Sequence, residues 1–340
     1  MHRDKTTPHR PPDKYRGRFA PSPTGPLHFG SLVTALGSYL QARSLGGEWL
    51  LRIEDIDPPR EQAGAADIIL QALDAYQLHW DGPVTYQSQR GDLYEAALTQ
   101  LKHQGSTFPC SCSRSTIKRN RAKAQKTQTL PSASNNAEIS HQAIYPGTCR
   151  TGLSPGTTTR AIRLRISAHN ESGVVIANGV VDKFIDGLQG QQITSLTTEV
   201  GDFIVRRSDG LYAYHLAVVV DDAEQGITEV VRGTDLLAST APQRYLQKSL
   251  GYSHPNYCHL PIATNRSGQK LSKQAFARPI EGQNCGPTLL KALAFLGQCP
   301  DADLIGASPG VIMAWAVENW TFNKIPKRNA LYSGFTPASH

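Results

Sequence analysis

The chain has 340 residues and a formal net charge of +7. This length is enough to bury a large core and to form two or three domains. There is no run of about 18 uninterrupted apolar residues, which excludes a membrane-spanning helix. Residues 1–14 are polar and Pro-rich and lack the apolar stretch of a secretory signal, so we expect a cytoplasmic protein with reduced thiols.

Positive charge is concentrated in two segments. Residues 1–18 carry six Lys or Arg against two Asp, and residues 114–126 carry six Lys or Arg and no acid. These segments account for +10, so the rest of the chain carries −3. Runs of charge usually form solvated surface, and the net charge alone therefore does not establish a nucleic-acid partner.

Residues 21–31, with the sequence PSPTGPLHFGS, lead into a helical pattern that ends near residues 46–47, a Gly pair. A Gly-containing turn before a helix suits an anion, because the first N–H groups of the helix are unpaired. Gly30 lets the backbone approach a phosphate, and His28 can add a donor. One face of this helix is apolar: Leu32, Val33, Leu36, Tyr39 and Leu40.

Strands and helices then alternate. We predict a strand over residues 49–53, helices over about 61–78 and 92–104, a hairpin over 203–214, strands over 217–220 and 227–231, and a helix over about 242–250. This alternation predicts an α/β fold with a doubly wound parallel sheet, whose ligand site lies beyond the carboxyl ends of the strands. Glu54, the pair Asp221 and Asp222, and Arg232 lie at such ends, although the aspartates, like Asp235, are better explained as turn or cap residues.

Two segments interrupt the alternation, and the end of the chain turns helical. Residues 113–142 are polar and low in aromatics, which predicts an exposed or disordered insertion. The expected units are a flexible tail (1–14), the first half of the catalytic domain (15–105), an inserted subdomain (106–200), the second half (201–275), a helical C-terminal region (276–328) and a tail (329–340).

A second distinctive segment, KLSKQ at residues 270–274, places two lysines three residues apart in a polar loop. A mobile loop that carries ammonium groups suits the charge that develops on a leaving pyrophosphate.

Together these segments resemble a known family. Residues 21–31 resemble the HIGH signature of class I aminoacyl-tRNA synthetases, and residues 270–274 resemble their KMSKS signature. RFAPSPTG at 18–25 and RIEDID at 52–57 narrow the resemblance to the glutamyl/glutaminyl branch, over about residues 16–326. The chain departs from the signatures at four positions: Phe29, Ser31, Leu271 and Gln274.

The resemblance implies a Rossmann-like fold and ATP-dependent activation of L-glutamate, in which the α-carboxylate attacks the α-phosphate and pyrophosphate leaves, with Mg²⁺ accompanying ATP. Guanidinium groups suit the substrate carboxylates, and an acid suits the ammonium group. The implied glutamate contacts are Arg18, Ser22, Glu54, Tyr214 and Arg232. The implied ATP contacts are His28, Gly30 and Lys273, and the implied catalytic residues are His28, Lys270 and Lys273. From the residues alone, Tyr214 is equally well explained as a core residue with a satisfied hydroxyl.

Three cysteines, Cys110, Cys112 and Cys149, are clustered as in a zinc site. The resemblance adds Tyr145 as the fourth ligand of one structural Zn²⁺ in the inserted subdomain. The alternative is three ordinary buried thiols.

The resemblance is strongest to short members of the branch that lack an anticodon-binding domain, because no residues remain here to form one. For such members it implies transfer of glutamate to the queuosine base at the wobble position of tRNA(Asp). Three alternatives remain open: a truncated enzyme that charges a tRNA 3′ end, a non-catalytic tRNA-binding or regulatory protein, and an unrelated nucleotidylyltransferase. The sequence does not determine the oligomeric state, and a monomer is favoured.

Overall fold

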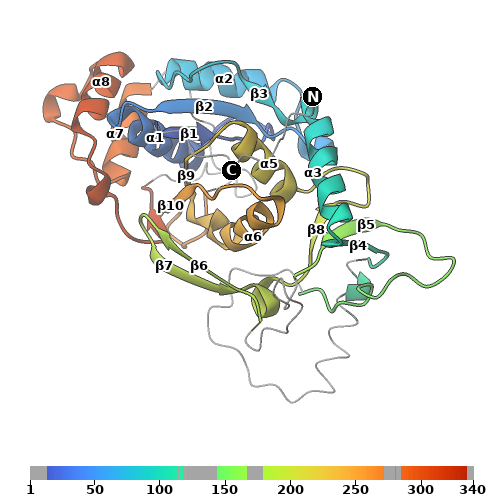
Figure 1. Ribbon diagram of the computed structural model, residues 1–340. Coiled ribbons are helices and arrows are strands. Elements are labelled where there is room, and N and C mark those ends of the chain that lie inside the picture. The colour runs from blue at the N-terminus through green and yellow to red at the C-terminus, as the bar shows by residue number, and fades with distance from the viewer. Residues whose placement is uncertain are drawn as a thin grey trace, which may run out of the picture.

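The computed structural model describes residues 14–113, 115–117, 119, 144–166, 179–271, 280 and 285–334. Parallel strands lie at its centre, with helices around them (Figure 1). On one side, β2 (Glu48–Ile53) pairs in parallel with β1 (Arg16–Phe19) and with β3 (Thr85–Tyr86). On the other, β10 (Asn256–Leu260) pairs in parallel with β9 (Glu229–Gly233) and β6 (Val181–Asp186).

A hydrogen bond joins the two groups of strands. The amide of Thr228, just before β9, donates to the carbonyl oxygen of Arg16 in β1 at 3.0 Å. This contact places β1 beside β9, so the strands follow the order β3-β2-β1-β9-β10-β6, and the ladders among these strands within each of the two groups are parallel. Parallel strands place their carboxyl ends at one edge, where ligands of open α/β sheets bind.

Two apolar cores hold the helices in place. The first lies between the sheet and helices α1 (Phe29–Ser44), α2 (Ala65–Ala75), α7 (Cys285–Phe295) and α8 (Pro309–Asn319). The second lies among α3 (Gly91–His103), α5 (Tyr214–Glu224) and α6 (Thr240–Leu250). Figure 1 shows α5 and α6 side by side, away from the layer of α1, α7 and α8. Helices thus cover the sheet from both sides.

The remaining elements are short. β4 (Thr107–Cys110), β5 (Ala161–Leu164) and β8 (Phe203–Arg206) form an antiparallel sheet, and β7 (Gly190–Ser195) forms a hairpin with β6. β11 (Ile262–Thr264) pairs with β12 (Ala330–Tyr332). Single helical turns are η1 (Pro58–Arg60), η2 (Gln87–Gln89), η3 (Leu196–Val200), η4 (Thr234–Ser239), η6 (Ala302–Leu304) and η7 (Phe322–Lys324).

Most predicted elements are present, but one predicted strand and one arm of a predicted hairpin are not. The helices α2, α3 and α6 and the strands β2 and β9 lie where the sequence predicts them, within a few residues, and α7 and α8 lie within the predicted helical C-terminal region. The predicted strand at residues 217–220 is wrong, because these residues lie inside α5, where all four are buried. A short apolar run does not distinguish a buried strand from a buried helix. The second arm of the predicted hairpin is reduced to a single bridge between Arg206 and Tyr212, because α5 begins at Tyr214.

Among the residues that the structure describes, no helix is long and apolar enough to cross a membrane.

Candidate active site

The turn at residues 21–31 leads directly into α1, and His28 is the residue that caps this helix. Its Nδ1 accepts a hydrogen bond from the backbone N–H of Ser31 at 3.2 Å, and the Ser31 hydroxyl lies 3.2 Å from Nε2. Gly25 has a φ of +124°, in the region that side chains other than glycine rarely adopt. The turn therefore places the start of α1, where the helix dipole concentrates partial positive charge, at the carboxyl edge of the sheet.

The lysine loop approaches the same turn. A Cβ added to Gly30 would lie 3.5 Å from the carbonyl oxygen of Leu271, and the amide of Ile280 donates to the carbonyl oxygen of Leu27 at 3.0 Å. The described residues on both sides of segment 272–279 thus contact the residues around His28. Lys273 itself lies outside the described residues. Lys270 is described, and its Nζ pairs with Asp235 at 2.6 Å.

Arg18, at the end of β1, is buried and already has a charged partner. Its Nε and Nη2 donate to the two carboxylate oxygens of Asp222 in α5 at 3.1 and 3.4 Å. Arg52 in β2 contacts the same carboxylate at 2.8 Å and lies 3.5 Å from Glu54. Nε of Arg52 also lies 3.7 Å from Asp221, so two guanidinium groups and three carboxylates share one buried region beside the ends of β1 and β2.

Burial and the neighbouring charges shift the pKa values of Glu54 and Asp222. Burial raises the pKa of Glu54 to about 7, against the opposing effect of Arg52 and Arg18. Burial alone would also raise the pKa of Asp222, but Arg18 and Arg52 outweigh it and hold this pKa below its usual value. Glu54 is thus a buried carboxyl whose charged form would gain from a further cation, such as an ammonium group.

Asp221, beside Asp222 in α5, binds a second group of side chains. It accepts hydrogen bonds from Gln87 at 2.7 Å, from Arg90 at 2.5 Å and from the hydroxyl of Tyr94 at 2.9 Å. The sequence interpretation assigned both aspartates to a turn or cap. In the structure they instead connect α5 to β1, β2, η2 and α3.

Arg232, near the end of β9, is buried among uncharged acceptors. Its Nε donates to Nε2 of His259 at 3.0 Å and its Nη1 to Gln243 at 2.8 Å. Its Nη2 donates to the hydroxyl of Thr240 and to the carbonyl oxygen of Leu236. None of these partners is a carboxylate, so the positive charge of Arg232 is not neutralised by them.

Tyr214, the first residue of α5, lies among the other predicted glutamate contacts. Burial raises the pKa of its hydroxyl, and the charges of Arg232, Glu54 and Arg18 all act on that hydroxyl. The structure therefore brings Arg18, Glu54, Tyr214 and Arg232 into one region at the carboxyl edge of the sheet. Ser22 is exposed in the nearby turn.

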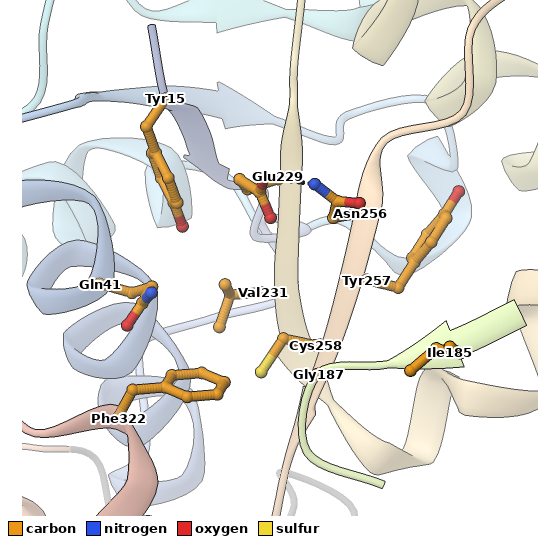
Figure 2. Close-up of a pocket in the computed structure, with 10 residues that line it drawn as sticks. All are labelled: Tyr15, Gln41, Ile185, Gly187, Glu229, Val231, Asn256, Tyr257, Cys258 and Phe322. Atoms are coloured by element: carbon orange, nitrogen blue, oxygen red, sulfur yellow. Dashed lines mark hydrogen bonds between the residues drawn. The ribbon is translucent and has the colours of Figure 1, made fainter. Parts of the chain in front are cut away.

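A separate hollow of about 200 Å³ lies on another part of the sheet (Figure 2). Val231 and Cys258 line this hollow, whereas their neighbours Arg232 and His259 are not among its lining residues. Ten residues line it: Tyr15, Gln41, Ile185, Gly187, Glu229, Val231, Asn256, Tyr257, Cys258 and Phe322. None of the predicted glutamate contacts lines this hollow.

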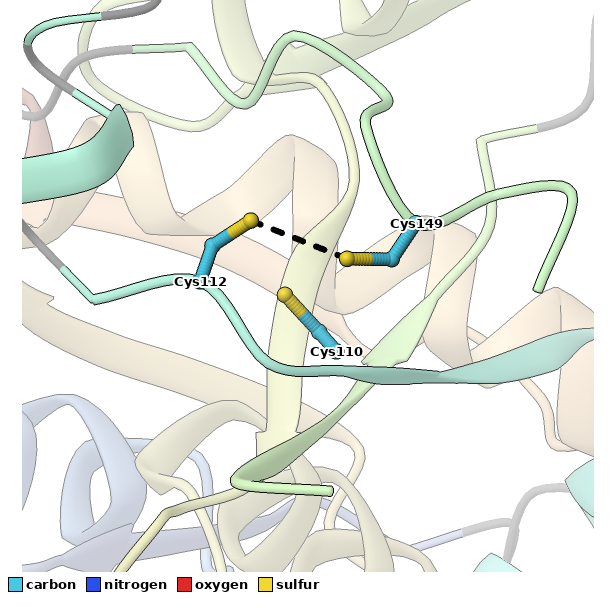
Figure 3. A group of neighbouring side chains, drawn as sticks. All are labelled: Cys110, Cys112 and Cys149. Atoms are coloured by element: carbon cyan, nitrogen blue, oxygen red, sulfur yellow. Dashed lines mark hydrogen bonds between the residues drawn. The ribbon is translucent and has the colours of Figure 1, made fainter. Parts of the chain in front are cut away.

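The three clustered cysteines meet at the end of β4 (Figure 3). The sulfur atoms of Cys110, Cys112 and Cys149 all lie within 4.8 Å of one another, and those of Cys112 and Cys149 are 3.6 Å apart. The Tyr145 hydroxyl lies 3.6 Å from the sulfur of Cys110 and 3.9 Å from that of Cys112. The six cysteines of the chain are free thiols. The structure thus assembles all four predicted ligands in one place.

The fold and these sites define the class of protein. A parallel sheet, a His-Gly turn at a helix N-terminus and an adjacent lysine loop are the features of a class I aminoacyl-tRNA synthetase. Residues 14–282 match the family model described as tRNA synthetases class I (E and Q), catalytic domain, and the chain belongs to this family. The predicted resemblance and the prediction of an ATP-dependent ligase are thereby confirmed.

Individual relatives and solved structures give a more specific comparison than the family model. The chain is 51% identical to a glutamyl-Q tRNA(Asp) synthetase of Dechloromonas aromatica over an alignment of 318 residues. This alignment covers 93% of this chain and 97% of that protein. It is 48% identical to the protein of the same name from Chromobacterium violaceum, over 92% of this chain and 95% of that protein. Among solved structures, the glutamate-tRNA synthetase of Elizabethkingia anophelis matches with a TM-score of 0.71 and 26% identity, over 95% of this chain and 68% of that chain.

Proposed function

We propose that this protein activates L-glutamate with ATP and transfers the glutamyl group to the queuosine base at the wobble position of tRNA(Asp). The name shared by the relatives at 48–51% identity supports this acceptor. The observation that carries the proposal of glutamate as substrate is the convergence of Arg18, Glu54, Tyr214 and Arg232. These residues come from distant parts of the chain and supply two cations, one acid and one hydroxyl.

Each charged group of glutamate has a partner in this arrangement. Glu54 would bind the α-ammonium group, because its buried carboxylate is favoured by an added positive charge. Arg232 would bind a carboxylate, since its charge has no acidic partner among its hydrogen-bond acceptors. Arg18 adds a second cation, and its ion pair with Asp222 partly neutralises its charge. Tyr214 and Ser22 supply hydroxyl groups.

The phosphates of ATP, with Mg²⁺, would lie at the N-terminus of α1 beside His28 and Gly30. The α-carboxylate of glutamate attacks the α-phosphate, forming the mixed anhydride while the bond to pyrophosphate breaks. No protein nucleophile is needed, so positioning and charge stabilisation provide the catalysis. Lys270 and Lys273 would neutralise the leaving pyrophosphate. Lys270 would then either break its ion pair with Asp235 or bind Asp235 and pyrophosphate together.

We expect Arg232→Ala to raise the glutamate KM by roughly tenfold to a hundredfold, because a charge-assisted hydrogen bond contributes about 1.5–3 kcal/mol. ATP–pyrophosphate exchange with glutamate measures this, and glutamine should not support exchange. Arg43→Ala is a suitable control, because Arg43 pairs with Asp81 rather than with any proposed site residue. An unchanged glutamate KM in Arg232→Ala would remove Arg232 from the site.

We further propose that Cys110, Cys112, Tyr145 and Cys149 hold one structural Zn²⁺. Sulfur ligands about 2.3 Å from a tetrahedral zinc lie about 3.8 Å apart, close to the 3.6 Å between Cys112 and Cys149. Buried Arg163 donates to the sulfur of Cys110 at 3.3 Å, which favours the thiolate that zinc needs. The metal would cross-link β4 to residues 145–149 and anchor the inserted subdomain.

Protein purified without chelator should contain about one zinc per chain, as a closed site with four ligands requires. Cys112→Ser should lower both the zinc content and the melting temperature, while glutamate-dependent exchange by the folded fraction persists. Cys299→Ser, at an exposed thiol, should change neither quantity. Elemental analysis that finds no zinc in the wild-type protein would refute the site.

The proposal also includes the division into the units given above, a cytoplasmic location and a monomeric state. The basic stretch at residues 114–126 lies between the two pairs of zinc ligands and would contact tRNA. Most of this stretch lies outside the described residues.

A further inference from the structure

Arg232 has five N–H donors, and the orientation of its guanidinium group depends on what each donor contacts. Four of the donors have acceptors in the described residues: Nε to His259, one of Nη1 to Gln243, and both of Nη2 to Thr240 and Leu236. One N–H of Nη1 therefore remains for a ligand. The acceptor for Nε is Nε2 of the His259 imidazole, and this nitrogen can accept a hydrogen bond only when it carries no proton.

A buried acid determines which nitrogen of His259 is protonated. Oδ2 of Asp186 lies 2.5 Å from Nδ1 of His259, so Nδ1 carries the proton and donates it to the carboxylate. Nε2 is then free to accept from Arg232. Both side chains are fully buried.

The other oxygen of Asp186 is fixed by the backbone. Oδ1 accepts from three amide groups, those of Leu188 at 3.0 Å, Gln189 at 2.9 Å and His259 at 3.1 Å. The carboxylate therefore cannot turn, and only an acceptor fits the Oδ1 position.

The pairing of the strands brings Asp186, His259 and Arg232 together. β10 lies between β6 and β9, and the register places His259 opposite Arg232 and Tyr257 opposite Asp186. Burial lowers the pKa of His259, and the charge of Arg232 lowers it further against the opposing effect of Asp186, so the ring is neutral near pH 7.

We propose that Asp186 and His259 are positioning residues for the glutamate site: Asp186 sets the tautomer of His259, and Nε2 of His259 orients Arg232 so that its remaining N–H meets a carboxylate of the substrate. This inference rests on the proposed binding of glutamate by Arg232. Neither residue touches the substrate itself. Both act through the direction of one guanidinium group.

Asp186→Asn tests the tautomer without a change of shape. Because Oδ1 must remain an acceptor for three amides, the new NH₂ group has to face Nδ1 of His259. Nδ1 must then accept, the proton moves to Nε2, and Nε2 and Nε of Arg232 become two opposed donors. We expect the glutamate KM to rise about tenfold, with the ATP KM unchanged and kcat within about threefold. Asp182→Asn is the matched control, because Asp182 lies on the same strand and pairs with Arg244 instead.

Two replacements of His259 separate positioning from packing. His259→Gln places an amide near Nε2, where it can accept from Arg232, whereas His259→Asn reaches only the Nδ1 position. We expect the glutamate KM of His259→Gln to lie at least about threefold closer to wild type than that of His259→Asn. Both variants remove the ring, so a purely structural role would damage both equally. This pair remains decisive if Asp186→Asn does not fold.

The outcomes are separable from those of the proposed function. A wild-type glutamate KM in Asp186→Asn, or equal effects of the two His259 variants, would overturn the positioning role. If the wild type shows no glutamate-dependent exchange, the proposed function fails. Histidine ¹⁵N NMR then still tests the chain of contacts, since His259 should be the Nδ1–H tautomer in the wild type and the Nε2–H tautomer in Asp186→Asn. The same tautomer in both proteins would refute it.

Discussion

Replacing Asp222 by Asn should lower the free energy of unfolding by about 3–5 kcal/mol, because it leaves two buried guanidinium groups without their shared carboxylate. The side chains of Arg18 and Asp222 are each 5% exposed, and that of Arg52 is fully buried. Water therefore cannot compensate for the lost charge. Urea denaturation followed by tryptophan fluorescence measures the change.

The control for this variant is Asp209→Asn, which removes an ion pair with Arg207 at the surface. Pairs of this kind contribute about 0–1 kcal/mol, so its effect should be small. A loss in Asp222→Asn no larger than that in Asp209→Asn would show that Asp222 does not hold the two arginines together. Because Arg18 loses its anchor, the glutamate KM of any folded Asp222→Asn should rise as well.

Lys273→Ala should lower kcat for glutamate activation by roughly 10²–10³-fold, the cost of removing one group that stabilises developing charge. The charge of Lys273 is needed where pyrophosphate forms, so the glutamate KM should change far less than kcat. The described residues around its loop, Leu271 and Ile280, contact the turn at the start of α1, which supports this position.

Lys183→Ala provides a comparison for Lys273→Ala, because Lys183 is an exposed lysine on β6. Its removal should leave pyrophosphate exchange unchanged. Normal turnover combined with weak glutamate binding in Lys273→Ala would contradict the proposed role.

Local patterns predicted the parts of the fold that local physics determines. The turn before α1 and the strand β2 follow from the positions of Gly, Pro and apolar residues close in sequence. Residues 217–220 of helix α5 were predicted as a strand because this run of Ala and Val is buried on every side, which removes the periodicity that distinguishes a helix from a strand. Only tertiary packing resolves such a segment.

The candidate site shows the same difference between features set by local sequence and features set by tertiary packing. Arg18, Glu54 and Arg232 stand at strand ends or in recognisable motifs, so the sequence points to them. The local sequence favoured only a turn or cap role for Asp222 and gave no signal for His259, because their partners lie 204 and 27 residues away along the chain. The contact of His259 with Arg232 follows from the strand order, and that of Asp222 with Arg18 from the packing of α5 against β1; local sequence supplies neither. The predicted role of Tyr145 likewise came from the family resemblance rather than from its neighbours in sequence.

The acceptor is tested most sharply by glutamate transfer to three preparations of tRNA(Asp): one with queuosine, one with guanosine in its place, and one with queuosine but without the 3′-terminal adenosine. The proposed reaction predicts ATP-dependent incorporation of labelled glutamate into both queuosine-containing preparations, with the label on the modified nucleoside after nuclease digestion, and none into the guanosine form. Incorporation that requires the terminal adenosine and ignores queuosine would contradict the proposal and identify an enzyme that charges the 3′ end.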